Sequence, residues 1–193
     1  MPAPAKTYHH GDLREALVAA GTALLRERGG EDFTLRECAR RAGVSHAAPK
    51  HHFPGFDDLL AEIAARGFEA FTQALETAAA DCDTAGSRLQ AMSEAYLRFA
   101  ASQPAIYGLM FGRRRISVNA PRLKAAAGAA WDQIRSAAAA VTGPAAAATS
   151  SAYVWSAVHG LAMLRHDKWL PVQSVGDMAF LGMVWQGLPK QAS

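Results

Sequence analysis

The stretch Thr34–Phe53, TLRECARRAGVSHAAPKHHF, decides the fold. Thr34 followed three residues later by Glu37 matches the S/T-x-x-E capping box, which satisfies two orphan amide groups at a helix start. Apolar residues then recur at helical spacing, and Gly43 follows the last of them, where a helix end favours a left-handed residue. A second, short helix is expected from His46. Two helices joined by a turn that contains Gly predict a helix-turn-helix.

The polar side chains of this stretch are cations, imidazoles and hydroxyls, which can donate hydrogen bonds to phosphate oxygens. The early residues of the second helix in such a motif can also reach base edges in the major groove. The candidate DNA-contacting residues are Thr34, Arg36, Arg40, Ser45, His46, Ala47, Lys50, His51 and His52. The pattern alone also permits an ordinary helical hairpin with a solvated basic face.

Three motifs carry a resemblance to a known family. The stretch quoted above resembles the DNA-binding segment of TetR-family transcriptional repressors, and YHHGDLREAL (residues 8–17) resembles the first-helix opening of one branch. Residues 153–164, YVWSAVHGLAML, resemble the Trp-His-Gly (WHG-type) C-terminal domain of that branch. The resemblance covers nearly the whole chain. It implies a homodimeric repressor that binds a palindromic operator on double-stranded DNA and is released by a small-molecule effector.

Two positions depart from the family's pattern. Relatives usually carry Tyr where this chain has Lys50, and a phosphate-holding Lys where it has Phe56. Lys50 can supply the missing cation from a different place. Asp57 and Asp58 favour the start of the following helix, but they also put negative charge near DNA. We therefore expect a grip on DNA that is related to that of relatives without being identical, and of modest affinity.

Composition and charge set wider bounds. The chain has 193 residues, half of them hydrophobic, which suits one ordinary domain or two small ones with a common core. Its net charge of +3 permits nucleic-acid binding without arguing for it strongly. Cys38 and Cys82 are too few for a disulfide framework, and the N-terminus lacks the apolar region of a signal peptide. We expect a cytoplasmic protein that does not enter a membrane.

Helical periodicity continues along the chain, and no stretch alternates as a strand does, so the expected fold class is all-α with about nine helices. We expect a flexible arm over residues 1–10, a three-helix DNA-binding domain over 11–56 whose first helix is capped by Asp12, and a regulatory and dimerisation domain over 57–193. A long helix over about 56–80 connects the two domains. The other helices are expected over about 87–102, 104–111, 121–141, 145–167 and 174–187, and Arg113–Arg115 is expected to end one of them.

Aromatic and Met residues gather in the C-terminal half. The candidate pocket residues are Phe68, Phe71, Met92, Tyr96, Phe99, Tyr107, Met110, Phe111, Trp131, Trp155, His159 and Met163. A helical bundle must bury such residues anyway, so each is also explained as plain core. The resemblance implies an apolar cavity in which a few polar groups orient an inducer. His159 can bond a ligand or, equally, a backbone carbonyl. We expect an apolar or aromatic ligand of modest size.

The last two expected helices are the candidate dimer interface, because small residues at helical spacing permit close approach and an apolar face lies near the chain end. The candidate residues are Ala152, Ser156, Ala157, Val175, Met178, Leu181 and Trp185. Intramolecular packing of the same faces is the alternative. Symmetric dimers are the commonest oligomers.

Two functions of other classes compete with this one. An enzyme is not expected, because the sequence shows no nucleophile with a placed base, no paired carboxylates, no Gly-rich phosphate loop and no metal-ligand spacing. Neither a cofactor nor a metal is expected. A helical interaction protein with weakened DNA binding is the other alternative, and Phe56 with its neighbouring acids allows it. An activator, or a regulator without a ligand, also remains open.

Overall fold

The computed structural model describes residues 10–29, 33–45, 48–112, 116, 120–171 and 176–189. Within these residues the chain forms eight α-helices and one short 3-10 helix, and it has no strand there, so the all-α prediction is confirmed. The elements in order are α1 (His10–Glu27), α2 (Leu35–Arg41), the 3-10 helix η1 (Ala48–His51), α3 (Phe56–Ala79), α4 (Ala85–Ser102), α5 (Pro104–Phe111), α6 (Pro121–Thr142), α7 (Ala147–His166) and α8 (Asp177–Gln186).

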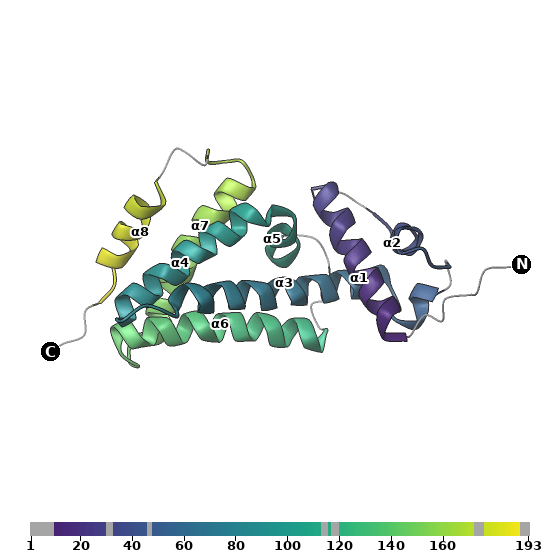
Figure 1. Ribbon diagram of the computed structural model, residues 1–193. Coiled ribbons are helices and arrows are strands. Elements are labelled where there is room, and N and C mark those ends of the chain that lie inside the picture. The colour runs from purple at the N-terminus through teal and green to yellow at the C-terminus, as the bar shows by residue number, and fades with distance from the viewer. Residues whose placement is uncertain are drawn as a thin grey trace, which may run out of the picture.

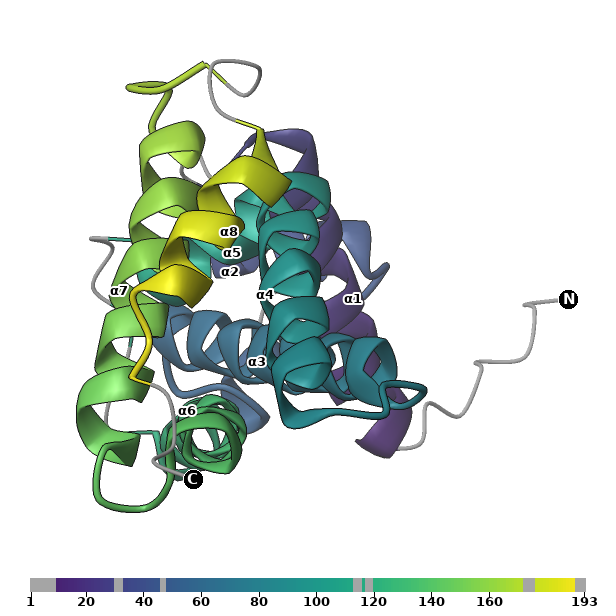
Figure 2. The ribbon, with the colours of Figure 1, turned by 90° about the vertical axis from the view of Figure 1, so that its left-hand side faces the viewer.

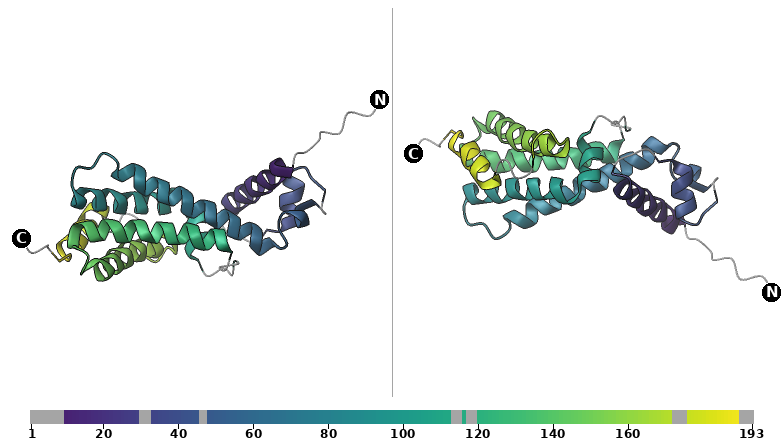
Figure 3. Two further views of the ribbon diagram at one scale, coloured as in Figure 1. Left: turned by 90° about the horizontal axis from the view of Figure 1, so that it is seen from below. Right: turned by 90° about the horizontal axis from the view of Figure 1, so that it is seen from above.

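The long helix α3 is the axis of the molecule. Figure 1 shows α1, α2 and η1 at its N-terminal end, and the helices α4 to α8 around the rest of its length. Half of its 24 residues are buried, among them Leu59, Leu60, Ile63, Phe71 and Leu75. Such burial around a helix requires packing on several sides. The N-terminal lobe (α1, α2 and η1) and the C-terminal bundle (α4 to α8) therefore both pack on one continuous helix, as the two views of Figure 3 also show.

The helices of the C-terminal bundle lie in two layers around α3. In Figure 2, seen from the end that carries α8, α4 and α6 lie against α3, while α7 and α8 form an outer layer. Helix α5 crosses α3 closely because Gly67 has no side chain: a Cβ there would lie 2.8 Å from atoms of both Ile106 and Met110. None of the described helices is long and apolar enough to cross a bilayer.

One local expectation was wrong, and another differs in the type of helix. Helix α1 already begins at His10, so Asp12 lies inside its first turn and is not its cap. The expected start of the motif's second helix, His46, lies outside the described residues, and Ala48–His51 form a short helix of the 3-10 type in place of an α-helix. Pro49 explains this difference, since it lacks an amide donor and disfavours the α conformation in the residue before it.

Some expectations fall outside the described residues. The arm expected over residues 1–10 does so except for His10, and so do His46, Ala47, Val175 and Arg113–Arg115. The remaining expected helices all exist, with ends that differ from the predicted ones by a few residues. The chain leaves α4 and enters α5 through Gln103 alone, because Pro104 is a favourable first residue of a helix.

Candidate nucleic-acid interface and regulatory core

The start of α2 is held by the predicted capping box. The amide of Thr34 donates to the Glu37 carboxylate at 2.8 Å, and the amide of Glu37 donates to the Thr34 hydroxyl at 3.2 Å. The end of α2 is equally well defined. Gly43 has a φ of +70°, and the amide of Val44 donates to the Ala39 carbonyl at 3.0 Å. Glycine adopts this φ without the steric cost that a Cβ brings, so the turn after α2 favours glycine at position 43.

The segment after the turn is anchored by two buried side chains. Pro49 and Phe53 are both buried, and the Pro49 carbonyl accepts from the amides of His52 and Phe53 at 2.9 and 2.8 Å. The Arg14 guanidinium lies over the Phe53 ring, 5.1 Å from its centroid, as a cation–π contact. Because Pro49 and Phe53 point inward, Lys50 and His51 of η1 are exposed.

The predicted DNA-contacting residues that the structure describes lie mainly at the surface. Exposed side chains are Thr34, Arg36, Arg40, Ser45, Lys50 and His51, while His52 is half-buried. Within the described residues, Arg36, Arg40 and Lys50 form no ion pair. Their charges are therefore available to phosphate groups. Thr34 differs, because its hydroxyl also donates to Glu37 at 3.0 Å and must give up that bond to donate to a phosphate.

Two neighbouring arginines are already engaged. Arg41 donates two hydrogen bonds to Glu27 of α1, at 2.6 and 2.5 Å, and Arg28 donates to Glu37. Side-chain hydrogen bonds from these arginines lower the pKa values of Glu27 and Glu37. Since such bidentate pairs fix both partners, Arg41 holds α2 against α1. The motif thus contains two arginines that are bonded to carboxylates and a second set of cations that are exposed without ion pairs among the described residues.

Cys38 is a core residue of the helix-turn-helix. Its side chain is fully buried, and burial raises the pKa of its thiol to about 11. The thiol is therefore protonated at neutral pH, and its chemistry is that of a small apolar side chain.

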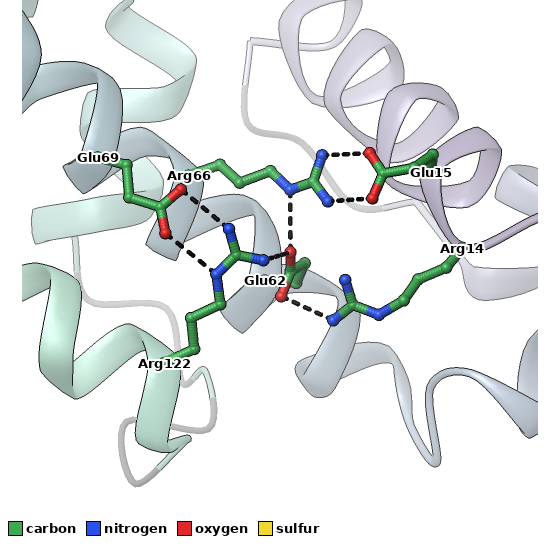
Figure 4. A network of polar contacts seen from close by, with 6 residues as sticks. All are labelled: Arg14, Glu15, Glu62, Arg66, Glu69 and Arg122. Atoms are coloured by element: carbon green, nitrogen blue, oxygen red, sulfur yellow. Dashed lines mark hydrogen bonds and ion pairs between the residues drawn. The ribbon is translucent and has the colours of Figure 1, made fainter. Parts of the chain in front are cut away.

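An ion-pair network joins the N-terminal lobe to the bundle (Figure 4). At its centre is Glu62 of α3, whose side chain is only 5% exposed. The Glu62 carboxylate accepts from Arg14 of α1 at 2.8 Å and from Arg66 of α3 at 2.9 Å, and it also contacts Arg122 of α6. Two further carboxylates complete what we term the Glu62 network. Glu15 accepts two bonds from Arg66, and Glu69 accepts two bonds from Arg122.

Electrostatics keeps the central carboxylate ionised. Burial by itself raises the pKa of Glu62, but hydrogen bonds from Arg14 and Arg66 and the positive charges of Arg14 and Arg122 outweigh it and hold the pKa at about 2. The side-chain hydrogen bond to Glu15 is the main reason why the pKa of Arg66 is raised. Three arginines and three carboxylates thus link α1, α3 and α6 with balanced charge.

The C-terminal bundle contains a polar triad inside an aromatic cluster. His159 Nδ1 lies 2.7 Å from the Tyr96 hydroxyl and 2.9 Å from the Tyr107 hydroxyl, and the two hydroxyls are 3.2 Å apart. Rings surround the triad: Trp155 lies edge-on to Tyr96, and Phe111 lies 4.9 Å from both Tyr107 and His159 between ring centroids. The imidazole is therefore bonded by two side chains of its own chain.

The environment of the triad favours uncharged groups. Burial raises the pKa values of Tyr96 and Tyr107 and lowers that of His159. All three residues are neutral at pH 7, so one hydroxyl can donate to an unprotonated Nδ1 and the other can bond to its neighbour.

The other predicted pocket residues pack around the triad. Ring contacts connect Phe68, Phe71, Phe99, Phe111, Trp131 and Trp155 to one another or to Tyr96. Met110 packs at Gly67, Met163 packs at the edge of the core, and Met92 lines a residual cavity of about 10 Å³ between α3, α4, α6 and α7. A space of this size holds at most a water molecule. The aromatic cluster is thus filled by its own side chains.

Comparison with known families identifies the chain. Residues 17–63 match the family described as bacterial regulatory proteins, tetR family, and residues 89–184 match the tetracyclin repressor-like C-terminal domain. The chain belongs to the TetR family. The Trp-His-Gly branch is not distinguished by these matches and stays a prediction. No curated protein matches the sequence.

Solved structures with a similar fold match nearly the whole chain. A protein with unknown function from Rhodococcus sp. RHA1 is 31% identical with a TM-score of 0.80, covering 96% of this chain and 100% of its own. A bacterial regulatory protein in the tetR family from Rhodococcus RHA1 is 17% identical with a TM-score of 0.67, covering 93% and 98%. The TetR-family transcriptional regulator PfmR from Thermus thermophilus is 18% identical with a TM-score of 0.64, covering 92% and 99%. The last two likenesses show the fold.

The outer layer of this TetR-family chain carries exposed apolar side chains. Of the predicted interface residues, Ala152 and Ser156 are exposed, Met178 is 58% exposed, and Ala157 and Trp185 are half-buried. Further exposed apolar side chains are Tyr153 and Leu164 of α7, Met183 of α8, and Trp169, which follows α7.

Leu181 does not fit the predicted interface. Its side chain is 0% exposed within its own chain, so it packs α8 onto the bundle and cannot touch a second copy in this conformation. Arg165 of α7 pairs with Asp177 of α8 at 2.6 Å and helps to hold the two helices together.

Sequence reasoning missed the residues that connect the two halves of the TetR fold. Glu62 lies 48 positions from Arg14 and 60 from Arg122, and nothing in a single sequence indicates their contact. One signal was present: Glu62 interrupts the otherwise apolar run LLAEIAA at residues 59–65. A buried carboxylate requires partners of opposite charge, and the apolar surroundings of Glu62 in the sequence indicate that need.

Proposed function

We propose that the protein is a homodimeric repressor that binds a palindromic operator and leaves it when a small apolar or aromatic ligand binds the C-terminal half. That it is a DNA-binding transcriptional regulator follows from its family. The observation that carries the proposal is the division of the cations. Among the described residues, Arg36, Arg40 and Lys50 face solvent without ion pairs, whereas Arg28 and Arg41 beside them hold carboxylates. Exposed cations on a helix-turn-helix suit a phosphate backbone.

The proposal includes how the chain is divided and where it acts. We place the boundary between a DNA-binding domain over residues 11–56 and a regulatory and dimerisation domain over residues 57–193 at the start of α3. A role on DNA places the protein in the cytoplasm. The reaction chemistry of an enzyme has no part in this function, and no cofactor is required.

The outer face of α7 and α8 supports the dimer. Exposed apolar side chains that gather on one layer mark an interaction surface. A two-fold axis there would place one helix-turn-helix on each side. Two such segments read a palindrome when they lie about 34–36 Å apart, one turn of DNA.

The aromatic cluster is the proposed ligand site, and its side chains must repack when a ligand binds. Because the cluster is filled, a ligand there must displace rings or the bonds among Tyr96, Tyr107 and His159. A state opened by the ligand then gains population at the expense of the DNA-binding state. A coupling free energy of about 1–3 kcal/mol changes operator affinity by about 5- to 150-fold.

Selection of bound duplexes from a random DNA pool, read at two salt concentrations, tests the proposal. We expect one enriched palindrome whose binding falls steeply with salt. A pool without enrichment at either salt, or a protein that stays monomeric while it binds, would contradict a dimeric operator reader.

A pair of lysine variants sharpens this test. Lys50→Ala removes an exposed cation from η1, so we expect weaker binding to every duplex and a salt slope reduced by about one. Lys124→Ala removes an exposed lysine from α6, in the bundle, and should leave both quantities unchanged. Equal effects of the two variants would remove Lys50 from the interface.

A further inference from the structure

A second hollow lies between the N-terminal lobe and the bundle. It is a groove of about 790 Å³ bounded by α1, α3 and the junction of α4 with α5, and it shares only Phe99 with the aromatic cluster described above. Its walls are mostly apolar and mostly small. Ala16, Ala19 and Ala23 line it from α1, and Gly67 and Ala70 line it from α3. Where short side chains face each other across two helices, they leave unfilled space.

The two ends of the groove differ in charge. At one end Arg66 donates two hydrogen bonds to Glu15, so the charges there cancel. At the other end Arg26, in the last turn of α1, forms no ion pair within the described residues and donates to the Gln103 side chain at 3.0 Å. Gln103 is both the C-cap of α4 and the N-cap of α5, so the opposite ends of two helix dipoles meet there and the Arg26 guanidinium supplies the positive charge of this end.

We propose that this groove binds a small organic anion with an apolar body, of which a medium-chain carboxylate is the simplest case. The anionic group takes the Arg26 guanidinium and the amide donors of the Gln103 side chain. The apolar body lies along the alanine-lined wall of α1, which extends about 16 Å from Glu15 to Arg26 at about 1.5 Å per residue. Charge complementarity at one end and apolar walls along the rest are the usual features of such sites.

The position of the groove gives the ligand a regulatory effect, and this part rests on the proposed function. The hydrogen bond from Arg26 to Gln103 is a polar contact that ties α1 to the α4–α5 junction. A carboxylate at Arg26 competes for that bond while its apolar body wedges against α1. Since α1 packs on α2, the ligand shifts the helix-turn-helix relative to the bundle.

Titration calorimetry of the full chain with decanoate below its micelle concentration tests the binding site, and 1-decanol is the matched neutral probe. We expect decanoate to bind more tightly than decanol. Arg26→Gln should weaken decanoate binding by about tenfold or more, in keeping with the loss of a charge-assisted hydrogen bond, and leave decanol binding unchanged. Arg88→Gln, which changes an exposed arginine near the start of α4 outside the groove, should change neither.

A substitution that fills the groove distinguishes binding there from binding in the aromatic cluster. Ala19 is exposed on the groove wall, so Ala19→Phe fills the space without disturbing the core and should abolish binding of both probes. Ala129→Phe makes the same change on an exposed face of α6 and should have no effect. Decanoate binding that survives both Ala19→Phe and Arg26→Gln, or no decanoate binding at all, overturns the proposal.

The binding result stands apart from the function on DNA. Operator affinity is measured with and without decanoate once a duplex has been selected. If decanoate binds through Arg26 but no duplex is ever enriched, the proposed repressor function fails while the groove site is upheld. If a palindrome is enriched but decanoate does not bind the wild type, the groove proposal fails alone.

Discussion

Replacing Glu62 by Gln should destabilise the protein more than any other single change in its ion-pair network. The substitution keeps the shape of the side chain but removes the negative charge that Arg14, Arg66 and Arg122 share. Arg66 and Arg122 retain Glu15 and Glu69, whereas Arg14 keeps only its contact with the Phe53 ring among the contacts described above.

The magnitude follows from the pKa of the carboxyl group. Its folded-state pKa of about 2 lies below the ordinary value of 4.5. At about 1.4 kcal/mol per pKa unit, the native environment of Glu62 stabilises the ionised form by about 3 kcal/mol. This magnitude agrees with the low end of the cost of breaking a buried ion pair, as suits a buried carboxylate with partly exposed partners. For a chain of this size about 3 kcal/mol lowers the Tm by about 6–12 °C.

Urea unfolding of wild type, Glu62→Gln and Glu69→Gln at pH 7 measures the effect. Glu69 pairs with the same Arg122 but is 46% exposed, so its loss should cost less than about 1 kcal/mol. A carboxylate with a depressed pKa stabilises fully above its unfolded value, and its contribution is lost as the pH falls toward the folded value. The gap between wild type and Glu62→Gln should therefore be complete above about pH 4.5 and shrink toward pH 2. Equal losses in the two variants, or a gap that does not change with pH, would refute this reasoning.

Three further outcomes follow from the core. Tyr107→Phe removes a buried hydroxyl that contacts both Tyr96 and His159, and urea unfolding should show a loss of about 1–3 kcal/mol. Burial lowers the pKa of His159, so the unfolded chain binds a proton first; the free energy of unfolding should fall as the pH drops below about 6.5, and His159→Phe should reduce that fall. At pH 8 a thiol reagent should modify the half-buried Cys82 and reach Cys38, whose pKa is raised to about 11, only after urea is added.

Local signals predicted the helices well because each acts within a few residues. The capping box of Thr34 and Glu37 and the left-handed Gly43 place the ends of α2, and both are present as expected. Pro104 and the helical spacing of apolar residues place α5 and the long helices in the same way. Cys38 was expected on an apolar helix face and is fully buried there.

The second element of the motif was harder to predict, because two local preferences conflict there. Helical spacing favours an α-helix, whereas Pro49 removes an amide donor and restricts the residue before it, and the described part is a 3-10 helix. Phe56 shows a related limit. It was considered only as a missing phosphate contact, yet its ring lies edge-on to Phe33 with centroids 5.0 Å apart. It therefore joins the start of α3 to the segment before α2.

The site as a whole depends on contacts between distant residues, which periodicity does not reveal. The resemblance indicated that Tyr96, Tyr107 and His159 belong to one region, but only their packing shows that they bond one another. The groove is equally invisible in the sequence. It arises because the alanines of α1 and the small residues of α3 face each other across two helices that are about fifty positions apart.

The two sides of α1 are held in different ways, and this asymmetry indicates how the lobe can move. On one side Arg14 ties α1 through Glu62 to both α3 and α6, and its contact with Phe53 carries the same tie to the end of η1. On the side that faces the groove, the polar contacts include the ion pair of Arg66 with Glu15 at one end and the bond from Arg26 to Gln103 at the other. A rotation of α1 about Glu62 keeps the stronger set of ion pairs and breaks the weaker contact. A small ligand bound in the groove therefore displaces the helix-turn-helix the most while it disrupts the fold the least.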